Sequence, residues 1–118
     1  MSKSFGIGVD IVDIEQFKKI PYDSKPNFYR KIFSNSEIKY CLKFKNPYEH
    51  FAGKFAIKEA IKKAVSDKIS LLDIETYHSK SKPMVRLKSK LARKYVFHVS
   101  LSHEKKLAVA VVISQSNQ

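Results

Sequence analysis

The sequence lacks the features that mark secreted and membrane proteins. It has a single cysteine, Cys41, so no intrachain disulfide can form and we expect a protein of the reducing cytoplasm. No apolar run approaches the roughly 20 residues that a membrane helix needs, and the N-terminus lacks the apolar block of a signal peptide. There is also no internal repeat, no low-complexity tract and no long linker. We therefore expect one domain over residues 1–118.

Acidic residues are scarce relative to basic ones. Asp and Glu number 11 against 23 Lys and Arg, which gives a net charge of +12. Between Lys18 and Lys63 there are twelve basic residues against four acidic ones. Such an excess predicts a polyanionic partner, namely nucleic acid, an acidic protein, a phosphorylated ligand or a membrane surface. A lysine-rich composition without functional meaning is the alternative.

The order of apolar and polar residues predicts helices in the first half of the chain and strands in the second. After a strand over about Phe5–Val12, short helices are expected to begin at Asp13, Pro26 and Ser34. The longest helix is expected over about 47–65, because its apolar residues recur at the spacing of one buried face. Strands are expected over 69–77, 84–87, 96–102 and 107–114, a short helix over 89–95, and a frayed end over 115–118. This order predicts an α+β fold, with helices packed on a largely antiparallel sheet and one long central helix.

Asp10 stands in the middle of the first expected strand, where a carboxylate is costly unless something neutralises it. Its side chain shares a strand face with Gly8 and Val12. On the long helix, Glu59 and Lys63 lie one turn apart on one face. Two simple interpretations are open: backbone donors satisfy Asp10, and Glu59 forms an ordinary ion pair with Lys63. The other interpretation is that the helix packs across the strand and brings Asp10 and Glu59 together.

A convergence of Asp10 and Glu59 would require a positive charge, because two carboxylates repel and one would otherwise stay protonated. Oxygen ligands with vacant positions suit magnesium, which keeps water molecules and binds substrate phosphates. Lys62 and Lys63 would then lie beside those phosphates. The pattern offers a magnesium site as a hypothesis, with a solvated helix face as the alternative.

Four blocks of the sequence together resemble a known enzyme family. They are "GIGVDIVDIEQF" (Gly6–Phe17), "RKIFSNSEIKYC" (Arg30–Cys41), "HFAGKFAIKEAIKKA" (His50–Ala64) and "VSLSHEKKLAVAVVI" (Val99–Ile113). In order and spacing they are similar to the holo-[acyl carrier protein] synthases, the small trimeric branch of the 4'-phosphopantetheinyl transferases. The resemblance covers nearly the whole chain. It implies a 4'-phosphopantetheinyl transferase-like fold and a homotrimer with sites between neighbouring subunits.

The resemblance also implies a reaction. The enzyme would transfer the 4'-phosphopantetheine moiety of coenzyme A to a serine hydroxyl of apo acyl carrier protein. This magnesium-dependent step of fatty acid biosynthesis would release adenosine 3',5'-bisphosphate. Neither nucleic acid nor a membrane is implied as a partner.

The residues of this reaction follow from the matched motifs. The resemblance implies that Asp10 and Glu59 bind magnesium and that Glu59 and Lys63 are catalytic. It places Lys63 and His103 against coenzyme A. We also expect Lys62, beside Lys63, and Ser66, in the loop after the long helix, to contact coenzyme A. The basic residues that it places against the acidic carrier protein are Lys18, Lys19, Lys25, Arg30 and Lys31. Four further lysines are open to either the carrier protein or the 3'-phosphate of coenzyme A: Lys39, Lys43, Lys45 and Lys54. The proton acceptor is open between a metal-bound water and Glu59.

The sequence departs from the family pattern in three places. The stretch "AVSDKIS" (Ala64–Ser70) has no glycine, where the family usually has a glycine-containing loop around the nucleotide. A G-K-P turn reads "SKP" (Ser81–Pro83), and Gln16 stands where the family often has an arginine. An inactive relative that only binds acyl carrier protein is therefore one alternative function.

A small basic nucleic-acid-binding module is the other alternative. That class of protein would expose aromatic residues among its lysines for base stacking. We instead expect six phenylalanines in the core: Phe5, Phe17, Phe28, Phe33, Phe51 and Phe55.

Overall fold

The computed structural model describes residues 3–117 and has an α+β fold, as expected from the sequence. Its strands are β1 (Lys3–Asp13), β2 (Ile74–Ser79), β3 (Lys82–Leu87), β4 (Tyr95–Glu104) and β5 (Leu107–Asn117). Its helices are α1 (Ile14–Lys18), α2 (Pro26–Arg30), α3 (Asn35–Leu42) and α4 (Pro47–Ala64), with short 3-10 turns η1 (Leu71–Asp73) and η2 (Lys90–Arg93). Within residues 3–117, no helix is both long and apolar enough to cross a membrane.

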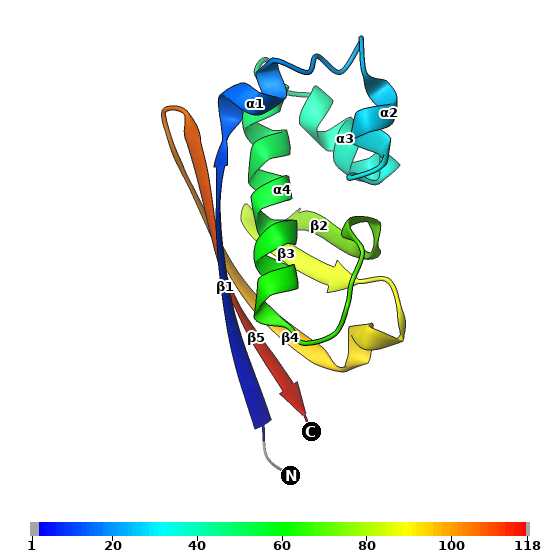
Figure 1. Ribbon diagram of the computed structural model, residues 1–118, viewed down its shortest axis with the longest axis vertical. Helices are drawn as coiled ribbons and strands as arrows, with labels where there is room; N and C mark the ends of the chain where they lie inside the picture. The colour runs from blue at the N-terminus through cyan, green and yellow to red at the C-terminus, as the bar shows by residue number, and fades with distance from the viewer. Residues whose placement is uncertain (1–2, 118) are drawn as a thin grey trace.

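The long helix α4 lies along one face of an antiparallel sheet (Figure 1). That sheet has the order β1-β5-β4, with Asp10 opposite Ala110 and His103 opposite Ala108. Strands β2 and β3 form a separate hairpin, in which β2 contacts α4 and β3 contacts β4. The short helices α1, α2 and α3 gather around the beginning of α4 (Figure 1).

Two glycines allow α4 to rest directly on β1. A methyl group on Gly8 would overlap the carbonyl oxygen of Ala60, and one on Gly6 would overlap that of Ala64. A side chain fits at either position only if α4 moves, because the neighbouring atoms belong to the helix backbone. The two glycines, two residues apart on one strand face, thereby fix the height of α4 above the strand that carries Asp10.

The helix starts follow the expected capping chemistry with one exception. The Ser34 hydroxyl accepts the amide of Glu37 at 3.3 Å, and the Glu37 carboxylate accepts the amide of Ser34 at 2.8 Å. This is the expected capping box. Asp13 caps α1, but its carboxylate accepts the amide of Glu15 at 3.0 Å, so the box expected with Gln16 is not formed.

The strands have the expected order but differ at two ends. Residues 69–73, expected in a strand, form a loop and the turn η1, and β2 begins only at Ile74. The end of β5, expected to fray, pairs through Ser116 with both β1 and β4. Backbone pairing on both sides holds this polar end in place, whereas its composition suggested a free tail. Gln118 lies outside the described residues.

The six phenylalanines divide into core and surface residues. The core contains Phe17, Phe33 and Phe51, with Phe55 partly buried against them. Phe5 is 67% exposed on β1 and Phe28 is 36% exposed on α2, so their assignment to the core was wrong. Phe5 is exposed because Gly6, the next residue, faces α4, and neighbouring strand residues point to opposite sides.

The side of the β1-β5-β4 sheet that faces away from α4 is strongly apolar. Ile7, in the middle of this side, is 70% exposed. The exposed residues that form what we call the outer apolar face are Phe5, Ile7, Val9 and Ile11 on β1, Val111 and Ile113 on β5, and Val96 on β4. Residues 3–117 of one chain leave this face uncovered.

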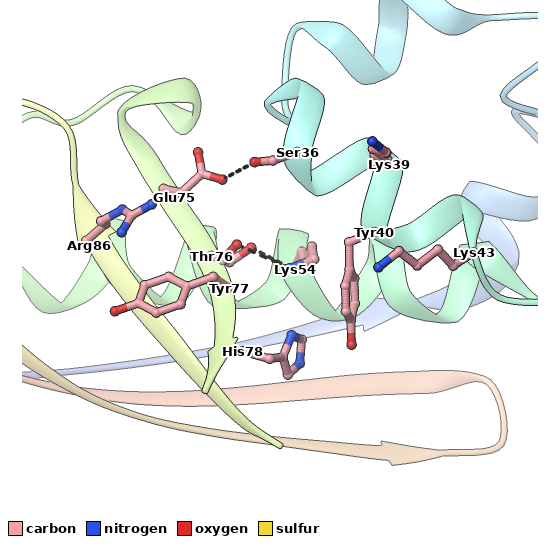
Figure 2. A pocket seen from close by; sticks show the side chains of 10 residues that line it. All are labelled: Ser36, Lys39, Tyr40, Lys43, Lys54, Glu75, Thr76, Tyr77, His78 and Arg86. Atoms are coloured by element: carbon pink, nitrogen blue, oxygen red, sulfur yellow. Dashed lines mark hydrogen bonds between the residues drawn. The ribbon is translucent and has the colours of Figure 1, made fainter. Parts of the chain in front are cut away.

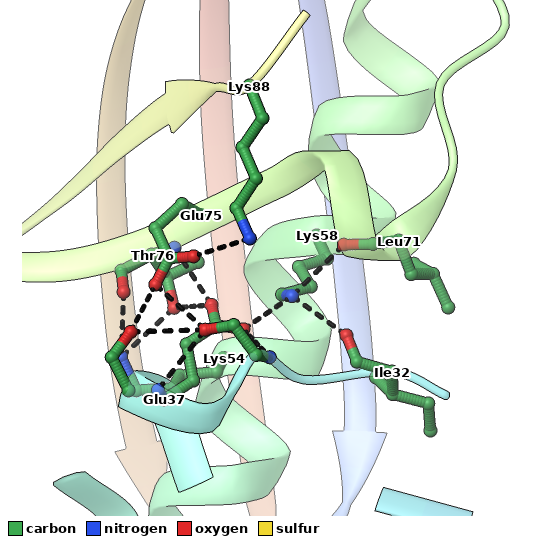
Figure 3. A network of polar contacts seen from close by, with 10 residues as sticks. Ile32, Glu37, Lys54, Lys58, Leu71, Glu75, Thr76 and Lys88 are labelled. Atoms are coloured by element: carbon green, nitrogen blue, oxygen red, sulfur yellow. Dashed lines mark hydrogen bonds and ion pairs between the residues drawn. The ribbon is translucent and has the colours of Figure 1, made fainter. Parts of the chain in front are cut away.

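A buried ion pair joins α4 to α3. The fully buried Lys58 donates to the Glu37 carboxylate at 2.7 Å and to the carbonyl oxygens of Ile32 and Leu71 at 2.8 and 3.0 Å (Figure 3). Burial lowers the pKa of Lys58, and the Glu37 carboxylate opposes that shift. These contacts anchor the helical turn that carries Glu59.

Candidate functional site

Asp10 on β1 lies against Lys63 of α4. The Lys63 ammonium donates to Oδ1 of Asp10 at 3.0 Å and to the carbonyl oxygen of Val9 at 3.1 Å. Glu59 lies one helical turn before Lys63 and therefore on the same side of α4. The structure thus joins Asp10 to Lys63 from two distant parts of the sequence, on the side of α4 that also carries Glu59.

The simpler interpretation of Glu59 does not describe its contacts. Lys63 pairs with Asp10, and the cation nearest Glu59 is that of Lys62, at 3.9 Å from Oε2. The Asp10 side chain keeps 16% of its surface exposed, so its carboxylate faces a partly solvated position at the edge of α4. A lysine from α4 neutralises it there.

The packing of small residues explains why these groups meet. Gly6 and Gly8 precede Asp10 on the strand face that α4 covers. On the neighbouring strand β5, the buried Ala108 and Ala110 also face α4. Because these residues are small, with Val112 opposite Gly8 as the larger side chain of this face, α4 lies close to the sheet, and the next polar residue on β1 emerges at the helix edge.

The two carboxylates suit a hard divalent cation whose remaining ligands would be water and substrate oxygens. Both acidic side chains offer carboxylate oxygens, the ligands that magnesium prefers. In the part of the chain that the structure describes, no three side chains of His, Cys, Asp or Glu gather as a metal site. The ammonium of Lys63 already lies against Asp10, so this position favours positive charge. Two carboxylates with open positions fit an ion that is completed by water and phosphate oxygens.

An open groove of about 710 Å³ begins at the end of α4, and we call it the phosphate groove. Its walls include Lys62, Ser66 and Lys68. The chain leaves α4 at Val65 in an extended conformation, and none of residues 65–70 has a positive φ. The missing glycine therefore leaves no backbone strain in this loop. Lys62 and Ser66, expected at coenzyme A, lie here close to Lys63.

His103, the other residue expected at coenzyme A, lies elsewhere. Its Nε2 is 3.3 Å from the carbonyl oxygen of Glu49, and its ring packs against Gly53. Gly53 and Lys63 are ten residues apart on α4, which corresponds to about 15 Å along the helix axis. A single chain therefore does not bring His103 to the group of Asp10, Glu59 and Lys63.

A cavity of about 490 Å³, which we call the basic cavity, lies between the β2–β3 hairpin and helices α3 and α4 (Figure 2). A smaller pocket that shares Tyr40, Lys54 and His78 with it is lined by His103. Its basic and aromatic lining residues are Lys39, Tyr40, Lys43, Lys54, Tyr77, His78 and Arg86. The sequence indicated three of these lysines only as individual basic residues. The cavity itself was missed, because it exists only once the β2–β3 hairpin lies against α3 and α4.

The charges in the basic cavity are mainly positive. Glu75 is the only carboxylate among its lining residues, and Lys88 pairs with it at 3.1 Å. The ammonium of Lys54 donates to the Thr76 hydroxyl at 3.0 Å, and burial lowers the pKa of Lys54. Burial also lowers the pKa of His78, with the nearby Lys54 acting in the same direction. Such a surplus of cationic groups suits a phosphate.

The residues expected to dock the carrier protein are exposed on α1 and α2 or directly beside these helices. They are Lys18, Lys19, Lys25, Arg30 and Lys31. The same region contains an apolar groove of about 180 Å³ lined by Gln16, Phe17, Ile20, Phe28, Ile32 and Phe55. The exposed ring of Phe28 belongs to this groove, which sequence analysis missed because the aromatic residues were all assigned to the core.

Comparison with known proteins identifies the family. Residues 6–112 match the model of the 4'-phosphopantetheinyl transferase superfamily, and the chain therefore belongs to this superfamily. A relative from Thermodesulfovibrio yellowstonii, named holo-[acyl-carrier-protein] synthase, is 40% identical over 111 residues. The match covers 92% of this chain and 96% of that relative.

Solved structures of similar proteins share the fold. A crystal structure of a holo-(acyl-carrier-protein) synthase from Bacillus anthracis in complex with CoA (3',5'-ADP) has a TM-score of 0.80 and 32% identity, covering 95% of this chain and 96% of that one. The Helicobacter pylori holo-[acyl-carrier-protein] synthase in complex with coenzyme A has a TM-score of 0.76 and 34% identity, covering 92% and 98%. The 4'-phosphopantetheinyl transferase-like fold expected from the sequence is confirmed.

Proposed function

We propose that this enzyme transfers the 4'-phosphopantetheine moiety of coenzyme A to a serine hydroxyl of apo acyl carrier protein. The products are holo acyl carrier protein and adenosine 3',5'-bisphosphate, and the step serves fatty acid biosynthesis. The observation that supports it most directly is the contact of Asp10 with Lys63, on the side of α4 that carries Glu59 and next in the chain to Lys62, which lines the phosphate groove. The names and coenzyme A complexes of similar proteins agree with these substrates. A cytoplasmic location stays a prediction.

Asp10 and Glu59 are the residues that would hold magnesium. Their carboxylate oxygens and the preference of this position for a cation fit such an ion. Magnesium, when bound, supplies charge neutralisation for the pyrophosphate of coenzyme A. The rest of the chemistry falls to the side chains around it.

The lysines of α4 bind and stabilise the phosphates. The Lys63 side chain is long and 57% exposed. Its ammonium stabilises the negative charge that develops on the leaving phosphate. Lys62 and Ser66 donate hydrogen bonds to phosphate oxygens from the wall of the phosphate groove. Glu59 is the proton acceptor that the chain itself offers to the incoming serine hydroxyl. Most of the rate enhancement then comes from positioning and electrostatics.

The active form would be a homotrimer with sites between neighbouring subunits. The outer apolar face supports an assembly, because exposed apolar patches of this kind mark protein–protein interfaces. The distance between His103 and Lys63 along α4 supports a shared site, to which one subunit supplies Asp10 and Glu59 and another supplies His103. The basic cavity of that second subunit would take the 3'-phosphate of coenzyme A, with Lys43 and Lys54 as donors.

The acidic carrier protein would dock on α1 and α2. The exposed basic residues there attract an acidic surface and accelerate encounter. The apolar groove between Phe17 and Phe28 would receive an apolar side chain of the carrier. Charge would then set the approach, and the groove would set the orientation of the serine.

Mass spectrometry tests this proposal. Purified protein with magnesium and coenzyme A should add a phosphopantetheine mass to apo acyl carrier protein. Asp10→Ala and Glu59→Ala should abolish the mass gain while thermal unfolding and circular dichroism stay those of the wild type. Glu104→Ala, which removes an exposed carboxylate on β4, serves as the matched control.

Each other outcome of this experiment would contradict part of the proposal or favour another function. Transfer that persists in both variants would remove the metal site from the proposal. Carrier binding without transfer by the wild type would favour an inactive relative. Nucleic-acid binding without any mass gain would favour the basic module.

A further inference from the structure

Asp67 is a carboxylate on the wall of a groove that, under the proposed function, receives an anionic substrate. An isolated negative charge there would repel phosphate. Asp67 is not isolated, since the Tyr95 hydroxyl donates to its Oδ2 at 2.5 Å and the Lys94 ammonium donates to the same oxygen at 3.0 Å. These two hydrogen bonds hold the pKa of Asp67 below its usual value. The carboxylate therefore stays ionised and paired.

The loop around Asp67 is held at two points. At its start, the Ser114 hydroxyl donates to the carbonyl oxygen of Ala64 at 2.7 Å, the last residue of α4. Three residues later, Asp67 ties the loop to Tyr95, where β4 begins. Ser66 lies between these two anchors and lines the phosphate groove. Side-chain hydrogen bonds from the β4–β5 region thus set the path of a loop that has no glycine.

We propose that Asp67 and Tyr95 form a clamp that positions Ser66 and the end of α4 for the phosphates of coenzyme A. The inference rests on the proposed function, because it requires that the phosphate groove takes coenzyme A. Both are positioning residues, which touch neither the reacting serine nor the phosphorus atom. A loop that is ordered before binding loses less conformational entropy when the ligand arrives, so the clamp raises affinity.

The clamp and a plain charge effect predict opposite changes in affinity for an anionic ligand when Asp67 is removed. If Asp67 acted only through its charge, its removal would strengthen the binding of an anionic ligand. If Asp67 acts as a clamp, its removal weakens binding although a repulsive charge has gone. Asp67→Asn separates the two further, because the amide oxygen still accepts the Tyr95 hydroxyl while the charge is lost.

The test compares four variants by steady-state kinetics with coenzyme A and apo acyl carrier protein. Tyr95→Phe and Asp67→Ala should raise the KM for coenzyme A by about 3- to 10-fold and leave kcat within about twofold. Asp67→Asn should recover most of the affinity. Tyr48→Phe is the matched control, since it removes a hydroxyl that accepts the amide of Tyr22 at 3.1 Å, near the start of α4. It should lower the melting temperature to a similar extent and leave the KM for coenzyme A unchanged.

Hydrogen exchange separates failure of the clamp from failure of the proposed function. Amides of residues 65–70 should exchange faster in Tyr95→Phe than in the wild type without any ligand, and Tyr48→Phe should leave them unchanged. Equal exchange rates, tighter coenzyme A binding by Asp67→Ala, or an unchanged KM in Tyr95→Phe would each overturn the clamp. A wild type that exchanges slowly here and yet transfers nothing would instead refute the proposed function.

Discussion

Replacing Gly8 with alanine should damage catalysis more than folding. The added methyl group would overlap the carbonyl oxygen of Ala60 and lie 2.9 Å from its carbonyl carbon, both part of the helix backbone. No rotamer change relieves this contact, so α4 must move by on the order of 1 Å to reach an ordinary contact distance. Glu59 and Lys63 move with the helix, while Asp10 stays on β1. A misplacement of this size costs about 100-fold in rate.

The loss of stability in Gly8→Ala should be modest by comparison. Overpacking of this kind costs about 1–3 kcal/mol, and in a domain of this length each kcal/mol corresponds to roughly 4 °C in melting temperature. Urea unfolding followed by circular dichroism measures the first quantity, and the carrier-protein mass assay gives kcat. The protein should therefore remain folded at assay temperature and lose most of its activity.

Gly53→Ala provides the stability control on the same helix. There the added methyl group would meet only side-chain ends, with Leu101 Cδ2 at 2.9 Å and His103 Nε2 at 3.1 Å. Those ends can shift, and alanine favours a helix over glycine by about 1 kcal/mol. Its free energy of unfolding should equal or exceed that of the wild type. A folded Gly8→Ala variant with wild-type kcat would refute the idea that the height of α4 above β1 sets the site.

Three further predictions concern the rest of the fold. Lys58→Met leaves the Glu37 carboxylate buried without its cation and should lower the free energy of unfolding by about 3–5 kcal/mol in urea titrations. Burial lowers the pKa of His50 and His78 from 6.5, so the unfolded chain binds more protons and stability should fall as the pH drops through that value. Melting curves between about pH 5 and 8 measure this slope, and replacing both histidines with glutamine should flatten it. Ser81 has a φ of 68° in the β2–β3 turn, so Ser81→Gly should add about 1 kcal/mol of stability, seen as a higher melting temperature.

The local features of the fold were predictable, because they depend on residues that are close together in the sequence. The capping box of Ser34 and Glu37 and the bounds of α4 follow from chemistry within a few residues. Period-two alternation also placed Asp10 on the face of Gly8. The same alternation did not say which face of β1 the helix covers, and Phe5 was therefore assigned to the wrong environment.

The sequence predicted the candidate site only on the condition that the long helix packs across the first strand. Spacing showed that Glu59 and Lys63 share a helix face, but the choice of Asp10 as the partner of Lys63 depends on how α4 crosses β1. The glycines that decide this crossing are visible in the sequence, and their packing role is not, because a missing side chain leaves no periodic signal. The basic cavity was out of reach for a related reason, since His78 and Lys54 meet only after the β2–β3 hairpin docks.

Salt should act in opposite directions on the two surfaces that the proposed function uses. Each copy of the chain has a net charge of +12, so the three copies of the proposed trimer would repel one another, while the outer apolar face would draw them together. Raising the salt concentration from about 0.05 to 0.5 M screens the repulsion and should stabilise the trimer, as measured by sedimentation velocity. The same change should slow association with the acidic carrier protein, as measured by stopped-flow fluorescence, because docking on α1 and α2 is guided by charge. A trimer that dissociates as the salt concentration rises would mean that ion pairs hold it together. An association rate that does not change with salt concentration would mean that the exposed lysines do not guide the carrier protein.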